Sequence, residues 1–210
     1  MIPVPAVSRR ELFRRLGLAG AAALVLPALD RVLAFQRDVK AGATPAGALS
    51  ASEAATLAAI CSRLIPTDEN GPGAAEARAS VYIDRALTGW LAPFREAYAV
   101  GLAAVDEATR ARGAKRFVDL APGEQDAALR SLEDTPFFAL VRTHTIQGTF
   151  CDPAYGGNQN FVGWDLVGYP GVRLNVTAAD QRMSEYAKPI RRSAYDYAMF
   201  ANTMGASDAH

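Results

Sequence analysis

Residues 148–173 of the chain read GTFCDPAYGGNQNFVGWDLVGYPGVR. This stretch contains six glycines, two prolines and five aromatic residues, and no hydrophobic period of 2 or 3.6 runs through it. Disordered segments are poor in aromatic residues, and a long irregular loop inside a compact domain usually has a function. We therefore expect an ordered loop that packs against another surface through its rings.

Helical patterns precede this loop. Ser50 and Glu53 have the S-x-x-E spacing of a capping box, and four apolar residues that follow share one helical face, namely Leu57, Ile60, Cys61 and Leu64. Apolar periodicity and two prolines predict four more helices, over residues 81–89, 94–112, 122–132 and from 136 to the loop. After the loop, Thr177 can cap a short helix over residues 178–187. With no alternating strand pattern, the sequence predicts an all-α fold: a small irregular helical domain with one long ordered loop rich in glycine and aromatic residues.

The first 34 residues have the features of a twin-arginine export signal. The stretch SRRELFR at residues 8–14 contains Arg9 and Arg10, and it departs from the usual pattern in the order of its Leu and Phe. The uncharged run over residues 16–29 has 14 residues, which is too short to span a bilayer and fits a signal peptide. An uncleaved anchor or a buried amphipathic helix are the alternatives. Export by this route carries a folded protein to the periplasm, often together with a cofactor-loaded partner.

The rest of the chain divides into three parts. Residues 35–49 are small and polar and predict a linker. Residues 50–188 form the predicted helical domain. Residues 189–210 are predicted to be a C-terminal tail with too few apolar residues to pack, which we expect to reach over a partner or to stay mobile.

Charge and motifs exclude several functions. After residue 34 the chain has 17 basic and 20 acidic residues, and because a nucleic-acid-binding surface needs clustered Lys and Arg, we expect no nucleic-acid partner. The sequence has no G-x-S-x-G, no G-x-G-x-x-G after a strand and no C-x-x-C-H. We therefore predict no catalytic, cofactor-binding or metal-binding residue in this chain, and an independent hydrolase is not supported.

Two parts of the loop resemble the signature of the gluconate 2-dehydrogenase subunit 3 family, namely DPAYGGN at residues 152–158 and GWDLVGYPG at 163–171. Residues 57–66, followed by GPGA at 71–74, resemble the first helix and turn of that family. The resemblance implies a non-catalytic small subunit of a periplasmic sugar or polyol dehydrogenase complex. It also implies a catalytic partner of the glucose-methanol-choline type that carries FAD, and a cytochrome c subunit whose haem c takes the electrons. Membrane association is expected only through the complex.

The loop is predicted to form the interface with the catalytic subunit. Glycine lets a backbone approach another surface closely, and Trp and Tyr are enriched at interface hot spots. Trp164 is the best candidate for the central residue of the interface, whose predicted members are Asp152, Tyr155, Gly156, Gly157, Asn158, Phe161, Trp164 and Tyr169. In two alternatives the rings form the core of the loop, or a sugar platform in a stand-alone exported carbohydrate-binding module.

The sequence leaves open the roles of three residues, namely Cys61, Cys151 and His144. Two cysteines in an exported protein favour a disulfide, and an intrachain Cys61–Cys151 bridge would connect the loop to the first helix. Two free thiols, or a bridge from Cys151 to a partner chain, are the alternatives. We expect His144 to be hydrogen-bonded in or near the core; the alternative is a role as proton relay or at the interface beside the partner's flavin.

Overall fold

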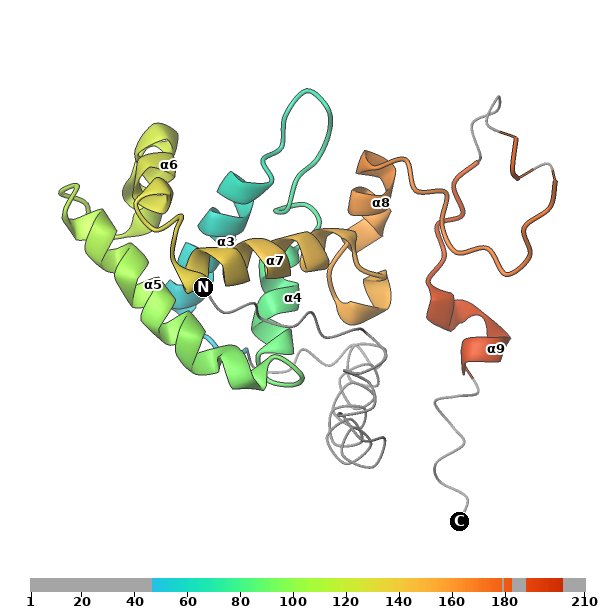
Figure 1. Ribbon diagram of the computed structural model, residues 1–210, viewed down its shortest axis with the longest axis horizontal. Coiled ribbons are helices and arrows are strands. Elements are labelled where there is room, and N and C mark those ends of the chain that lie inside the picture. The colour runs from blue at the N-terminus through green and yellow to red at the C-terminus, as the bar shows by residue number, and fades with distance from the viewer. Residues whose placement is uncertain (1–46, 179, 183–187, 202–210) are drawn as a thin grey trace, which may run out of the picture.

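The computed structural model describes residues 47–178, 180–182 and 188–201. This part of the chain consists of short and medium-length α-helices and 3-10 helices joined by loops, and this part contains no strand (Figure 1). The α-helices are α3 (Ala51–Leu64), α4 (Ala79–Ala86), α5 (Arg95–Arg110), α6 (Pro122–Arg130), α7 (Pro136–Phe150), α8 (Val162–Leu166) and α9 (Ala198–Ala201). The all-α prediction is confirmed. The predicted export signal with Arg9 and Arg10, and most of the predicted linker, lie outside the described residues.

Helix α3 begins and ends where its sequence indicates. The Ser50 hydroxyl accepts a hydrogen bond from the Glu53 amide at 3.4 Å, and the Glu53 carboxylate accepts one from the Ser50 amide at 2.9 Å, which is the predicted capping box. Leu57, Ile60 and Cys61 are buried along the predicted face. The helix ends at Leu64, because a residue before proline is disfavoured in the α conformation.

Helix α7 is central to the fold. It contacts α3, α4, α5 and α8, and Figure 1 shows it crossing the middle of the molecule. Thr135 caps it by accepting from the Phe138 amide at 3.2 Å, and Pro136 occupies the first turn, where its missing N–H costs nothing. Around α7 lies the apolar core, whose fully buried large members are Leu57, Ile60, Ile83, Leu87, Tyr98, Leu102, Val105, Phe117 and Val141.

The structure differs from the predicted helices after the loop. The Thr177 hydroxyl does accept from the Asp180 amide at 3.4 Å, but residues 178 and 180–182 are turn or irregular, so the predicted helix is wrong in its described first part. The Asp180 carboxylate accepts from the Thr177 amide and hydroxyl at 2.8 and 2.7 Å and pairs with Arg173. These contacts close a local turn that competes with helix formation. Within the described part of the chain, no helix is both long enough and apolar enough to cross a membrane.

Candidate functional site

The predicted loop follows α7 directly and is packed against it by Asn158. This side chain is fully buried. Its amide nitrogen donates to the Cys151 carbonyl at 2.8 Å, its amide oxygen accepts from the Gly163 backbone at 2.7 Å, and its own backbone N–H donates to the Gly148 carbonyl at 2.8 Å. Asn158 has φ of 45°, a left-handed conformation that Asn tolerates better than most residues. One residue thus connects the end of α7 to the beginning of α8.

The glycines of the loop allow close approach within the chain itself. A Cβ atom on Gly157 would lie 2.1 Å from the Gly148 carbonyl oxygen, and one on Gly163 would lie 1.9 Å from the Thr149 carbonyl oxygen. Both distances are far below van der Waals contact, so any side chain here would push the loop away from α7. The close approach that the sequence suggested for a partner is therefore made to α7.

Trp164 lies in the core of the loop. Only 7 % of its surface is exposed, and its indole N–H donates to the Phe150 carbonyl at 3.0 Å. The rings of Phe161 and Tyr169 pack on either side, with centroid distances of 5.3 and 4.9 Å. Of the alternatives for Trp164, this placement agrees with loop core, because the chain itself covers most of the ring.

Two further predicted interface residues hold the C-terminal segment. The Asp152 carboxylate accepts from the Ser193 hydroxyl at 2.6 Å and from the Ala194 amide at 2.8 Å. The Tyr155 and Tyr195 hydroxyls are hydrogen-bonded at 2.7 Å. Of the remaining predicted residues, Gly156 and Phe161 are half-buried and Tyr169 is 42 % exposed.

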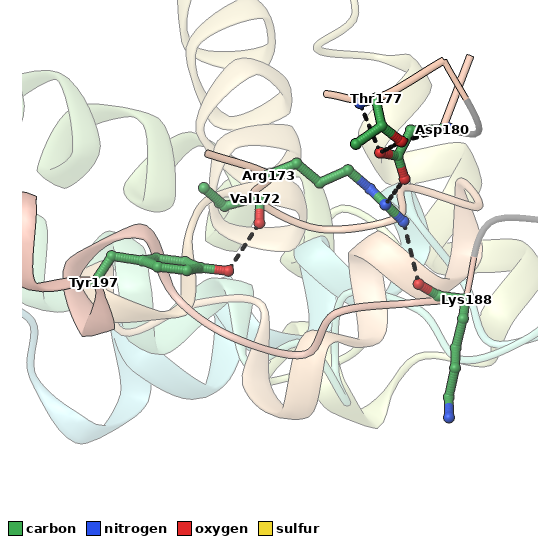
Figure 2. A network of polar contacts seen from close by, with 6 residues as sticks. All are labelled: Val172, Arg173, Thr177, Asp180, Lys188 and Tyr197. Atoms are coloured by element: carbon green, nitrogen blue, oxygen red, sulfur yellow. Dashed lines mark hydrogen bonds and ion pairs between the residues drawn. The ribbon is translucent and has the colours of Figure 1, made fainter. Parts of the chain in front are cut away.

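The C-terminal segment also pairs with the end of the loop. The Ile190 amide donates to the Pro170 carbonyl at 2.8 Å, and the Tyr197 hydroxyl donates to the Val172 carbonyl at 2.9 Å (Figure 2). A Cβ on Gly171, where φ is 90°, would lie 2.1 Å from the Ile190 carbonyl oxygen. Residues 189–201 therefore pack, contrary to expectation, because polar contacts to the loop replace the apolar burial that the sequence lacks.

Residues 51–171 match the family model described as gluconate 2-dehydrogenase subunit 3. The chain belongs to the gluconate 2-dehydrogenase subunit 3 family. Membership implies that this subunit is part of a multi-subunit dehydrogenase complex. Among curated proteins and solved structures, none matches the chain. The family match ends at Gly171, so Ser193, Tyr195 and Tyr197 lie beyond it. The sequence did not indicate a role for these three residues. Ser193 and Asp196 have S-x-x-D spacing and form a capping box, which is the signal that could have indicated an ordered segment.

Both cysteines of the subunit are free thiols, and the favoured intrachain bridge is absent from the structure. Cys61 on α3 faces Thr145 on α7, with 3.3 Å between the sulfur and the hydroxyl. Cys151 comes six residues after Thr145, about 9 Å further along α7 at 1.5 Å per residue, whereas disulfide Cα atoms lie at most about 7 Å apart. Burial raises the pKa of Cys61 to about 11 and that of Cys151 to about 12.

His144 is a core histidine of this subunit. It is buried, and its Nδ1 lies 3.0 Å from the Tyr98 hydroxyl. Burial lowers the pKa of the imidazole from its usual value, so His144 is neutral at neutral pH. Among the described residues, no group of three or more His, Cys, Asp or Glu side chains is placed to hold a metal ion.

Proposed function

We propose that this chain is the non-catalytic small subunit of a periplasmic, FAD-dependent sugar or polyol dehydrogenase complex. The observation that carries the proposal is the family match over residues 51–171. The catalytic partner, of the glucose-methanol-choline type, holds FAD and oxidises a hydroxyl of the substrate, and a cytochrome c subunit accepts the electrons through haem c. This chain stabilises the catalytic subunit and supports its export and assembly.

The loop contributes to the interface through the parts that its own packing leaves exposed. Gln159 and Asn160 are exposed at one end, and Val167 and Tyr169 at the other. The buried residues of the loop, Trp164 foremost, act on the interface indirectly, because they fix the positions of these exposed side chains. A preformed surface of this kind loses less conformational entropy on binding than a mobile one.

Export by the twin-arginine route is part of the proposal. A folded complex can leave the cytoplasm on a single signal, so Arg9 and Arg10 of this chain would serve a catalytic subunit that has no signal of its own. The complex then works in the periplasm, and any attachment to the membrane is made by the complex as a whole.

Co-expression with the flavoprotein encoded beside this chain tests the proposal. An affinity tag at the C-terminus of the chain should recover the flavoprotein with its yellow cofactor, and replacing Arg9 and Arg10 with lysine should hold both proteins in the cytoplasm. A flavoprotein that folds, is exported and oxidises its substrate equally well without this chain would overturn the accessory role. Export of both proteins by the lysine variant would overturn the export route alone.

One pocket supports a second candidate, a carbohydrate-binding module. It has a volume of about 490 Å³ and is lined by Tyr82, Trp90, Ile146, Gln147, Phe150, Cys151 and Tyr155. The Trp90 ring lies between Tyr82 and Tyr155, with centroid distances of 6.0 and 6.1 Å, and aromatic rings with a nearby amide suit the apolar face and hydroxyls of a sugar. Saturable quenching of tryptophan fluorescence by glucose or gluconate in the isolated chain, abolished in Gln147→Leu, would favour this candidate over the first.

A further inference from the structure

We propose that residues 167–178, 180–182 and 188–201 form a docking arm, a contact surface for the catalytic subunit that begins at the end of the loop and extends past it. This inference rests on the proposed function. The docking arm continues from α8 past the end of the family match at Gly171, and Figure 1 shows it on the far side of α8 from α5 and α6. From Val172 onward it is a part of this chain to which the family match assigns no role.

The docking arm displays most of the large apolar side chains that the described part of the subunit exposes. Its 29 described residues, of 149 in all, contain six of the ten exposed large hydrophobic residues. They are Val167, Tyr169, Leu174, Val176, Met199 and Phe200, with exposed fractions between 37 % and 61 %. Exposed apolar side chains gathered in one part of a soluble protein mark a contact surface.

A polar network ties separate parts of the docking arm together (Figure 2). The Arg173 guanidinium pairs with Asp180 and donates to the Lys188 carbonyl at 3.3 Å, and this side chain is only 20 % exposed. Asp180 in turn accepts from Thr177 at 2.7 and 2.8 Å. The network joins Arg173, Thr177 and Asp180 to Lys188, so Leu174 and Val176 lie between residues that are tied to one another. The apolar side chains are thus exposed by an ordered backbone, which reduces the entropy lost when a partner binds.

A groove at the base of the docking arm can receive a side chain from the partner. It has a volume of about 460 Å³ and is lined by Phe150, Asp152, Trp164, Val167, Tyr169 and Val172. Its walls come both from the loop and from the docking arm, and Tyr169 and Val167 stand exposed at its edge. The loop and the docking arm therefore form one continuous surface.

Charge indicates the chemistry of the partner. The described residues of the docking arm have five basic and two acidic side chains, whereas residues 47–166 have ten basic and fifteen acidic side chains. The docking arm is therefore positive on a subunit body that is negative. Complementary potentials across an interface select a partner and its orientation, so the facing surface of the catalytic subunit should be apolar at its centre with acidic residues around it.

The test uses the full chain co-expressed with the catalytic subunit. In the double variant Leu174→Asp/Val176→Asp, both changed side chains are exposed, so the melting temperature of the isolated chain should stay the same while affinity for the catalytic subunit falls at least about tenfold. The control is Val100→Asp, which places one aspartate on a 65 % exposed valine of α5, and it should bind normally. Lys188→Glu should weaken binding most at low salt, because screening reduces the contribution of rim charges.

The outcomes separate the two proposals. If the wild-type chain binds the catalytic subunit and the double variant binds equally well, the docking arm is refuted and the proposed function stands. If Val100→Asp weakens binding as much as the double variant does, the effect of added charge is not specific to the docking arm, which also refutes it. If the wild-type chain does not bind the catalytic subunit, both proposals fail.

Discussion

Replacing Trp164 with alanine should destabilise the isolated subunit. The ring is almost completely buried between Phe161 and Tyr169, and its N–H satisfies the Phe150 carbonyl. The variant removes the largest side chain of the loop and leaves a cavity at the junction of α7 and α8. It also leaves the Phe150 carbonyl without this donor.

The expected loss follows from the buried area. A buried Trp covers roughly 150–250 Å², which corresponds to about 4–6 kcal/mol at about 25 cal/mol per Å², and measured Trp→Ala changes in cores cost about 3–5 kcal/mol. We take about 4 kcal/mol, which is a large fraction of the total stability of a typical domain. At about 2–4 °C per kcal/mol for a chain of this size, the melting temperature should fall by roughly 8–16 °C.

Thermal unfolding of the isolated chain, followed by circular dichroism, measures this loss. Tyr169→Ala in the same loop is the control: Tyr169 is 42 % exposed, so its variant should lose much less stability. Trp164→Phe keeps an aromatic ring but lacks the N–H donor, and it should lie between the two. If Trp164→Ala has an unchanged melting temperature but no longer binds the catalytic subunit, the packing argument is refuted. Trp164 would then be a direct contact residue of the interface.

Three further predictions concern other parts of the subunit. Asp152→Ala removes the acceptor of two hydrogen bonds from residues 193 and 194, so amide exchange in residues 190–197 should become faster than in the wild-type chain while exchange in α3 stays slow. Iodoacetamide at about pH 8 should leave Cys61 unmodified in the folded chain, because the pKa of its thiol is raised to about 11. After unfolding without reductant, the reagent should modify both Cys61 and Cys151. If modification of the unfolded chain requires a reductant, the two cysteines are not free thiols. Burial lowers the pKa of His144, so the unfolded chain binds a proton near pH 6.5 that the folded chain does not. The contribution of His144 to the free energy of unfolding should be fully present above that pH and should decrease as the pH falls below it. In His144→Gln, the free energy of unfolding should depend less steeply on pH in this range.

The parts of the fold that the sequence predicted correctly depend on neighbours in the chain. Ser50 and Glu53 are three residues apart, and the apolar face of α3 repeats within one or two turns, so both can be read without knowledge of any other element. Pro136 marks the first turn of α7 for the same reason. The short helices inside the loop were missed, because α8 has only five residues and shows no full hydrophobic period.

The predictions that failed required knowledge of how distant segments meet. Cys61 and Cys151 could be joined only if α3 met the last turn of α7, but the register of the two helices places Thr145 opposite Cys61. The C-terminal segment has few apolar residues, and its order depends on Asp152, which is 41 residues before Ser193. A carboxylate that binds a distant hydroxyl and amide leaves no periodic signal in the sequence.

The residues that carry the family resemblance have structural roles within the chain. Asp152 holds the C-terminal segment, Asn158 joins α7 to α8, and Gly157 and Gly163 allow the loop to lie against α7. Trp164 fills the space between them. A loop built in this way can keep the same shape on different partners, because few of its characteristic side chains are left to distinguish one partner from another. Selectivity for a particular catalytic subunit should then depend on the exposed apolar and basic side chains of the docking arm, and exchanging residues 172–201 between two members of the family should exchange their preferred catalytic subunits.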